Sequence, residues 1–312
     1  MIGVALIGCG YWGKNYLRIL KEFEGIDLLA VFNRSSPIDA TLLGDVRLIR
    51  DLDFILADKR IDAVVISTPL ETHYEFTKRS LLAGKDVLLE KAFTNRSCDA
   101  WELGEIARKQ RRVIMAGHLF EYHPAVVELK KFISDGLIGR ITKISSERSG
   151  ISNSGENVSV LWSLGPHDIY IANTLVGRMP CEIDASNPAN GWDVMKLRLD
   201  YGGGISTNVC LDRTKKDRVR KIFVECERGS AFFDDTINGD KLVVYDADFK
   251  KVYSGGNFKG IPVLEREFAH FIDCVKNHVP PLTGAKDGYE NVVALECAEK
   301  SMTNKSPVKI IL

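Results

Sequence analysis

The chain has 312 residues, of which 45% are hydrophobic, and this length suits one large domain or two ordinary ones with filled cores. Its 42 basic residues balance 42 acidic ones, which excludes a protein drawn to nucleic acid or to anionic membrane by an overall positive charge. No apolar stretch approaches the roughly 20 residues of a membrane span and no secretory signal precedes the first apolar run, so we expect a cytoplasmic protein with a small-molecule partner.

Short β-branched runs alternate with longer amphipathic segments over the first third of the chain. We predict strands at 2–8, 26–32, 61–67, 86–90 and 112–117, with helices at about 11–23, 51–58, 71–83 and 97–110. Strand, helix, strand at this rhythm predicts an α/β fold in which residues 1–118 form a doubly wound dinucleotide-binding domain.

After residue 118 the pattern changes, and we assign 119–312 to a second α/β domain. A helix at about 123–135 is followed by long alternating stretches such as "MKLRLDY" and "KIFVEC", which predict a large, mainly antiparallel open sheet. Two late helices are expected at about 262–277 and 286–303. The one basic run, 212–221, is interpreted as a solvated hairpin between two antiparallel strands, because no aromatic residue interrupts it.

Gly8, Gly10 and Gly13 form a G-x-G-x-x-G motif between the first strand and the first helix, with Tyr11 and Trp12 inside the loop. In that setting the glycines permit a tight turn, the approach of a pyrophosphate and close helix packing, while the helix N-terminus supplies amides to the phosphates. The motif and the repeated strand and helix units behind it predict a dinucleotide site. Trp12 either stacks in the cofactor pocket or only packs.

The second strand ends in "FNRSS", where NAD-binding sheets usually place an acidic residue for the ribose 2′-hydroxyl. Asn33 removes the carboxylate that would repel a 2′-phosphate, and Arg34, helped by Ser35, offers that phosphate a charge-assisted partner. NADP(H) is therefore favoured, with NAD(H) as the alternative. An exposed turn with an incidental arginine is the other interpretation.

Seven cysteines are scattered singly from Cys9 to Cys297 without C-x-x-C spacing, so we expect no disulfide framework and no metal site. Neither a nucleophile elbow nor an H-E-x-x-H helix is present in the sequence.

The order of four segments resembles the glucose-fructose oxidoreductase, inositol dehydrogenase and MocA family: "IGCGYWG", "ISTPLETHYEFTKRSLLAGKDVLLEKA", "GHLFEYHPAVVELKKFISDGLIG" and "LWSLGPHDIYIANTLVG". The resemblance covers nearly the whole chain, and its middle segments are most similar to the branch that acts on sugars and nucleotide-linked sugars. It implies an active site between a Rossmann domain and an α/β domain. It also implies a homo-oligomer, dimer or tetramer, assembled through the open sheet.

Lys91 matches the lysine of the family's Glu-Lys-Pro motif, at the end of a strand where open α/β sheets bind ligands. The resemblance implies that the Lys91 ammonium donates to the reacting oxygen, while Glu90 positions the surrounding residues and does not react. A surface salt bridge is the plain alternative for such a pair. Ala92 departs from the family's proline.

His167 matches the family's active-site histidine, at the start of a helix in "SLGPHDIY". A histidine titrates near neutral pH and can relay the hydroxyl proton. Ser163 stands where many relatives have an aspartate, and serine can hydrogen-bond a sugar hydroxyl but cannot act as a carboxylate base. Asp168 is interpreted as a structural first-turn carboxylate.

Two further segments are expected to line the site by resemblance. Thr68, Pro69 and His73 would lie along the cofactor, or else form an ordinary helix start. Tyr122 and His123 would approach nicotinamide or substrate, or else pack in a linker between domains. The polar segment 152–160 suits a loop at the edge of the site.

The sequence thus favours an oxidoreductase that moves a hydride between nicotinamide and a secondary alcohol or ketone of a sugar or sugar nucleotide. Lys91 and His167 are its catalytic candidates. Two alternatives stay open: a relative that recycles tightly bound cofactor in a lyase or hydrolase reaction, and a sensor that binds dinucleotide or sugar without turnover.

Overall fold

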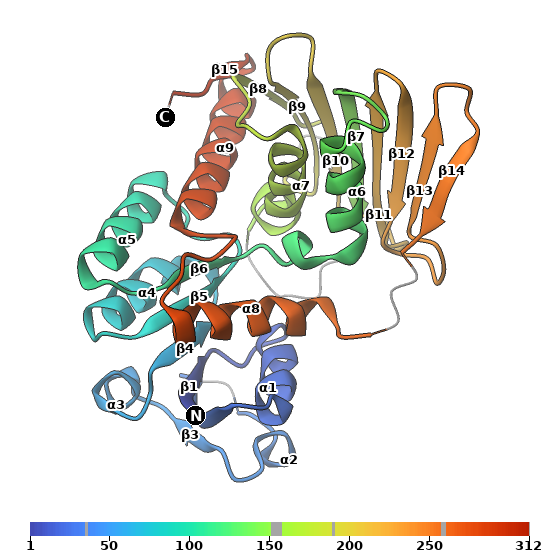
Figure 1. Cartoon of the computed structure of the whole chain (residues 1–312). Coiled ribbons are helices and arrows are strands. Elements are labelled where there is room, and N and C mark those ends of the chain that lie inside the picture. Colours follow the sequence, from blue (N-terminus) through green and yellow to red (C-terminus); the bar gives the residue numbers. More distant parts are fainter. Residues whose placement is uncertain (35–36, 151–157, 189–190, 257–259, 312) are drawn as a thin grey trace. The chain divides into compact units, whose positions relative to one another are not determined.

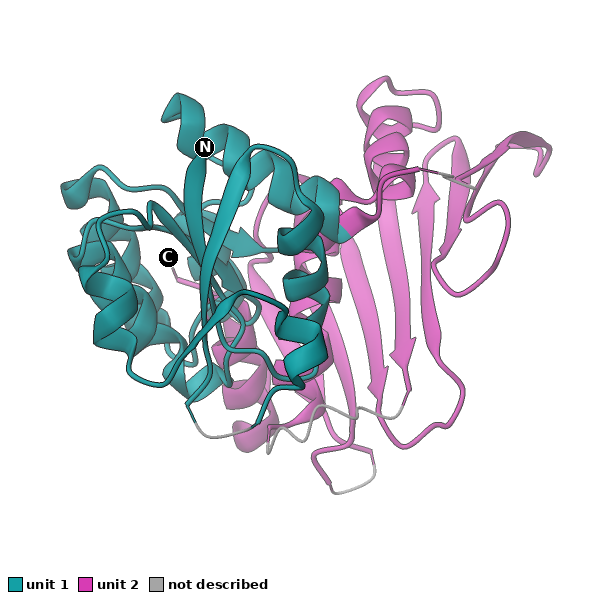
Figure 2. Ribbon diagram, turned by 90° about the horizontal axis from the view of Figure 1, so that it is seen from below, with its two compact units in different colours: residues 1–118, 264–292 teal, residues 119–263, 293–312 magenta. Residues whose placement is uncertain are grey.

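The computed structural model describes residues 1–34, 37–150, 158–188, 191–256 and 260–311 (Figure 1). The chain divides into two compact units, coloured in Figure 2: residues 1–118 with 264–292, and residues 119–263 with 293–312. The first unit therefore gains a late segment that lies far away in the sequence. The division into separate domains at residue 118 stays a prediction.

The first unit is built on a six-stranded parallel sheet in the order β3-β2-β1-β4-β5-β6 (Figure 1). This is the strand order of a doubly wound dinucleotide-binding fold, and it confirms the predicted fold class. The strands are β1 (Ile2–Ile7), β2 (Ile26–Phe32), β3 (Arg47–Ile49), β4 (Ala63–Ile66), β5 (Asp86–Glu90) and β6 (Ile114–Gly117).

Helices alternate with these strands along the chain: α1 (Gly13–Glu22), α2 (Ala40–Leu43), α3 (Leu52–Ala57), the 3-10 turn η1 (Leu70–Thr72), α4 (His73–Leu82) and α5 (Ser97–Gln110). The two late helices expected from the sequence are α8 (Val263–Asn277) and α9 (Ala285–Asn304). The central strands β4 and β5 are buried along their whole length, which explains their unbroken apolar runs.

The second unit contains a nine-stranded sheet in the order β14-β13-β12-β11-β7-β10-β9-β8-β15 (Figure 1). Its strands are β7 (Ile141–Ser149), β8 (Glu182–Ser186), β9 (Val194–Asp200), β10 (Ser206–Asp212), β11 (Val219–Cys226), β12 (Gly229–Asp234), β13 (Leu242–Asp246), β14 (Lys251–Gly255) and β15 (Val308–Lys309). Strands β7 and β10 run parallel and the other pairs are antiparallel, as the mainly antiparallel prediction requires.

Alternating burial along β9 gives this sheet one covered and one open face. The 3-10 turn η2 (Leu119–Tyr122) leads into α6 (Pro124–Ser134), and α6, η2 and α7 (Val160–Val176) pack together with the sheet. None of the helices described in the structure is long and apolar enough to cross a membrane.

Two local predictions were wrong. The basic run 212–221 is not a hairpin, because β7 lies between β10 and β11, and residues 213–218 cross over its end. The helix that carries His167 begins at Val160, so Pro166 lies inside it. Pro166 removes one backbone hydrogen bond there, while the buried residues Val160 and Leu161 hold the first turn in place.

Candidate active site

The glycine loop leaves room for a pyrophosphate at one position and is tightly packed at the two others. A Cβ at Gly8 would lie 2.5 Å from the carbonyl oxygen of Ser67, and a Cβ at Gly13 would lie 2.3 Å from the carbonyl oxygen of Gly8. A Cβ at Gly10 would meet nothing within 4 Å. Helix α1 starts at Gly13 without a side-chain cap, and its Lys14 and Asn15 N–H groups donate to the carbonyls of Gly10 and Trp12 at 3.2 and 2.8 Å. The positive dipole end of this helix favours a phosphate group. These features fit a dinucleotide.

The end of β2 gathers polar and basic groups beside this loop. The side-chain oxygen of Asn33 lies 3.4 Å from the backbone nitrogen of Cys9, and the exposed Arg34 follows it. The guanidinium of Arg50 donates to the Asn33 carbonyl at 2.6 Å. Arg50 was not among the residues selected from the sequence, because it directly follows β3, a three-residue strand that the pattern did not indicate. Ser35 lies outside the described residues.

Lys91 follows the last residue of β5 and is half-buried, and its backbone N–H donates to the Glu90 carboxylate at 3.0 Å. The Lys91–Ala92 peptide bond is cis. The Glu90 carboxylate also accepts from the indole N–H of Trp12 and, at 2.9 Å, from the Tyr16 hydroxyl. Glu90 therefore ties the glycine loop to the strand end that carries Lys91.

The pKa of Glu90 is raised by its burial, while the Lys91 charge and the donors from Tyr16, Trp12 and the Lys91 backbone act in the opposite direction. Only 5% of Glu90 is exposed, so it is not part of a solvated surface pair. The interpretation of Glu90 and Lys91 as an ordinary surface salt bridge is wrong for this reason.

His73 joins the two loops that follow β4 and β5. Its Nε2 lies 2.9 Å from the Thr68 carbonyl oxygen and its Nδ1 lies 2.8 Å from the Ala92 carbonyl oxygen. Burial lowers the pKa of this 1%-exposed side chain. Pro69 stands immediately before the 3-10 turn η1, and the Thr72 hydroxyl donates to Thr68 Oγ1 at 2.7 Å. His73 thus fixes the loop of Thr68 and the residue after Lys91 together.

His118 is a further buried histidine of the first unit that the sequence analysis did not select. Its pKa is lowered from 6.5 to about 3 by burial and by the Lys91 charge, while a hydrogen bond with the Asp287 backbone acts in the opposite direction. The imidazole is therefore neutral at physiological pH. The Lys91 charge thus contributes to the lowered pKa of both His73 and His118.

In the second unit, His167 lies on α7 against an aromatic and basic cluster. Its ring meets the Phe120 ring edge to face, with 5.3 Å between centroids, and the Arg148 guanidinium lies 4.9 Å from the centroid of Phe120. Arg148 is paired with Asp168, which also accepts from the Ser146 hydroxyl. Asp168 therefore has the structural role expected of it, although through a buried ion pair and not through the helix dipole.

The other residues selected in the second unit are buried. Ser163 lies one helical turn before His167 and donates to the Val160 carbonyl at 3.4 Å. The ring of His123 caps α6 by accepting from the Ala125 N–H at 3.2 Å, and its Nε2 lies 3.3 Å from Asp235. Tyr122 is 9% exposed. His123 has a helix-capping contact on one ring nitrogen and an acidic neighbour on the other.

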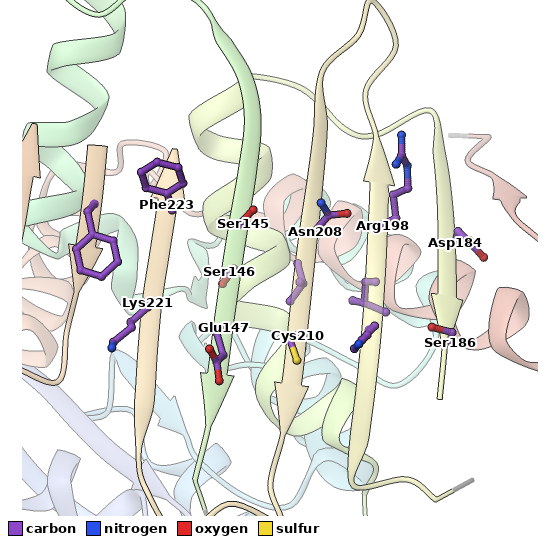
Figure 3. Close-up of a pocket in the computed structure, with 14 residues that line it drawn as sticks. Ser145, Ser146, Glu147, Asp184, Ser186, Arg198, Asn208, Cys210, Lys221 and Phe223 are labelled. Atoms are coloured by element: carbon purple, nitrogen blue, oxygen red, sulfur yellow. The ribbon is translucent and has the colours of Figure 1, made fainter. Parts of the chain in front are cut away.

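A hollow of about 550 Å³ lies on the open face of the nine-stranded sheet (Figure 3). Figure 3 shows Glu147, Cys210 and Lys221 on neighbouring strands, with Asn208 and Arg198 in the next row. None of the site residues selected from the sequence lines it. Among the described residues, no group of three or more His, Cys, Asp or Glu side chains is arranged to hold a metal ion.

Comparison with known proteins finds a family match in the first part of the chain. Residues 2–118 match a family described as oxidoreductases with an NAD-binding Rossmann fold, which confirms the resemblance found in the sequence for this part of the chain. The 2,7-anhydro-N-acetylneuraminate hydratase of Mediterraneibacter gnavus is 30% identical over 58% of this chain and 51% of its own length. The D-apiose dehydrogenase of Paraburkholderia graminis is 22% identical over 98% of this chain and 89% of its own.

Among solved structures, UDP-N-acetylglucosamine 3-dehydrogenase from Acidithiobacillus ferrooxidans superposes with a TM-score of 0.85. It is 21% identical and covers 97% of this chain and 98% of its own, a likeness that establishes the fold. The matches to the first curated relatives span only 51%, 57% and 63% of those proteins.

Proposed function

We propose that the protein belongs to this oxidoreductase family and transfers a hydride between a nicotinamide dinucleotide and a secondary alcohol or ketone of a sugar or sugar nucleotide. The observation that carries the proposal is the Glu90 carboxylate, which accepts hydrogen bonds from the indole of Trp12 in the glycine loop and from the backbone N–H of Lys91. The glycine loop is thereby tied to the strand end that carries the half-buried Lys91. Relatives named inositol 2-dehydrogenase and D-apiose dehydrogenase support a polyol or sugar substrate.

The glycine loop and the first turn of α1 would hold the pyrophosphate, and the loop of Thr68 and Pro69 would line the cofactor. When bound, the nicotinamide supplies or accepts the hydride. Lys91 would donate a hydrogen bond or a proton to the substrate oxygen, where negative charge develops. His167 would relay that proton, and Ser163, Tyr122 and His123 are proposed substrate neighbours.

NADP(H) is the proposed cofactor, with NAD(H) as the alternative. Arg34 and Arg50 both stand at the Asn33 strand end, where the 2′-phosphate of NADP(H) would bind. A hydrogen bond to a charged group is worth about 1.5–3 kcal/mol, so Arg34→Ser should weaken NADPH binding about 10- to 100-fold and leave NADH binding unchanged. Asn33→Asp should reverse the preference. Equal losses for both cofactors in Arg34→Ser would contradict the assignment.

The central test is oxidation of NADPH and NADH by the purified protein with a panel of keto-sugars and nucleotide-linked keto-sugars. Lys91→Met should bind cofactor like the wild type and lose about 10²- to 10⁴-fold in kcat. Lys109→Met, which removes an exposed lysine at the end of α5, is the matched control and should turn over normally. If Lys91→Met turned over as fast as the control, the proposed role of Lys91 would be wrong.

A second candidate reaction keeps the cofactor bound and reoxidises it in each turnover. The relative named 2,7-anhydro-N-acetylneuraminate hydratase favours this candidate, because its identity of 30% is the higher of the two reported above. Such an enzyme should copurify with dinucleotide, convert substrate without net change in NADPH absorbance, and still lose turnover in Lys91→Met. A sensor without turnover should keep its function in that variant.

We further propose that the protein is a cytoplasmic homo-oligomer that pairs through the open face of the nine-stranded sheet. Phe223, Phe232 and Val243 lie in register across β11, β12 and β13, and Phe223 is 36% exposed. Charges of both signs, Lys221 and Glu147, lie beside them, so a second copy can complement this face. Phe223→Glu should lower the mass measured by light scattering to that of one chain.

A further inference from the structure

A row of hydrogen-bonded polar groups, all buried except the exposed Trp12, links four parts of the first unit. Glu267 on α8 lies 3.2 Å from the Tyr16 hydroxyl on α1, which donates to Glu90 at the end of β5, and Glu90 accepts from Trp12 in the glycine loop. Glu267 and Tyr16 are 0% exposed. An acidic side chain from the end of the chain therefore reaches the strand end that carries Lys91.

The two carboxyl groups have very different surroundings. Glu90 accepts from the indole of Trp12, the hydroxyl of Tyr16 and the backbone of Lys91, and the Lys91 ammonium lies nearby. Glu267 faces only the Tyr16 hydroxyl, and its Oε1 is buried without a hydrogen-bond partner among the described residues. The pair therefore carries its negative charge on Glu90.

The number of protons available for the two hydrogen bonds of the Tyr16 oxygen also places the negative charge on Glu90 and a proton on Glu267. The Tyr16 hydroxyl has one proton, which it donates to Glu90. The remaining contact, between Tyr16 and Glu267, is then a hydrogen bond only if Glu267 supplies the proton. Burial and the nearby negative charge of Glu90 raise the pKa of Glu267 well above its ordinary value, which agrees with a protonated acid.

We propose that Glu267 is a positioning residue that acts as a neutral carboxylic acid. It donates to the Tyr16 oxygen, Tyr16 donates to Glu90, and Glu90 holds Trp12 and the Lys91 backbone in the geometry that binds the dinucleotide. The inference deepens the proposed function, because it assigns a role to a residue of α8 behind the cofactor loop and the proposed catalytic lysine.

The substitutions separate the proton from the charge. Glu267→Gln keeps the shape, is neutral and offers an N–H to Tyr16, so NADPH and NADH should bind within about twofold of wild type. Glu267→Leu and Tyr16→Phe each break the row and should weaken the binding of both cofactors about tenfold or more. Glu265→Leu, on the same helix, is the matched control and should bind normally.

Two outcomes would overturn the proposal. Glu267→Gln binding as weakly as Glu267→Leu would mean that an ionised carboxylate is required, and Glu267→Leu binding like wild type would mean that the row does not position the loop. Circular dichroism reports whether each variant is folded. If Glu267→Leu does not fold, Glu267→Gln and Tyr16→Phe still decide between the possibilities.

Two measurements on the free protein do not depend on cofactor binding or turnover. Infrared spectra at neutral pH should contain the carbonyl band of a protonated carboxylic acid, and this band should disappear in Glu267→Gln; its absence from the wild type would refute the neutral acid. The indole N–H resonance of Trp12, assigned with Trp12→Phe, should be the same in Glu267→Gln and wild type and should shift in Glu267→Leu. A wild type that binds neither cofactor while these signals appear would refute the proposed function alone.

Discussion

Replacing Asp168 by Asn tests the buried ion pair beside His167. The side chains of Arg148 and Asp168 are 3% and 1% exposed, and the Ser146 hydroxyl also donates to Asp168. Asparagine keeps the shape of the side chain but removes the negative charge, so Arg148 stays buried without a counter-ion. Breaking a buried pair from one side costs about 3–5 kcal/mol, and we expect the free energy of unfolding to fall by that amount.

The Phe120 ring does not offset this loss. It already lies 4.9 Å from the Arg148 guanidinium in the wild type, so its attraction of about 2 kcal/mol is not a new contribution in the variant. Replacing both partners, with Arg148→Met and Asp168→Leu, should recover most of the stability, because apolar side chains of similar volume need no counter-ion. The double variant thus separates the cost of a lone charge from the value of the pair.

Urea unfolding followed by both far-ultraviolet circular dichroism and tryptophan fluorescence measures these changes, and coincident curves justify a single free energy. Glu227→Gln is the control, because it breaks an exposed pair in which Arg140 is 86% exposed, and it should have no measurable effect. A loss of less than about 1 kcal/mol in Asp168→Asn would refute the reasoning. A double variant as unstable as the single one would refute it as well.

Three further predictions concern activity, packing and pH. His167→Asn should lower kcat about 10²- to 10⁴-fold with unchanged NADPH binding, measured by steady-state kinetics and cofactor fluorescence, and normal turnover would exclude a relay through His167. Gly288→Ala should lower the urea midpoint, because its Cβ would lie 2.5 Å from the buried Phe93 ring. Overpacking costs about 1–3 kcal/mol, which exceeds the gain of about 1 kcal/mol from the higher helix propensity of alanine. The free energy of unfolding should fall as pH is lowered from 6.5 toward 3, because the unfolded chain protonates His118 while the folded chain keeps it neutral. The slope of this free energy against pH should be smaller in His118→Gln by up to about 1.4 kcal/mol per pH unit. Equal slopes in unfolding experiments at several pH values would contradict that sign.

The sequence was sufficient for the parallel sheet because its strands are buried on both faces. Val64 and Leu88 are 0% exposed, and short runs of such residues bounded by turns are typical of strands buried on both faces of a parallel sheet. Strand β3 was missed because its three residues, Arg47–Ile49, are too short to establish a period. The hairpin at 212–221 failed for another reason: a strand from earlier in the chain, β7, inserts between its two arms, and local periodicity has no information on such pairing.

The glycine loop and Lys91 were recognisable because each occupies a fixed place relative to a strand. The roles of Arg50, His118 and Asp168 depend on neighbours that are distant in the chain, such as Arg148 for Asp168. A hydrophobic pattern classifies a charged residue only as polar, and it does not show whether that residue faces water or a buried partner. For this reason the fold was largely predictable, whereas the supporting contacts of the candidate site were not.

Glu267 shows where such a signal was nevertheless present. In α8 the buried apolar residues Leu264, Phe268, Phe271 and Val275 follow the period of a helix, and Glu267 stands in the same stripe. A carboxyl group in an apolar stripe requires either a partner or a proton, because burial of a lone charge is too unfavourable. Tyr16 is the hydrogen-bond partner of Glu267, and the raised pKa of Glu267 agrees with a bound proton. An acidic residue that interrupts an amphipathic pattern is therefore a reason to search the opposite helix for a donor, and here that search leads through Tyr16 to Glu90 and the cofactor loop.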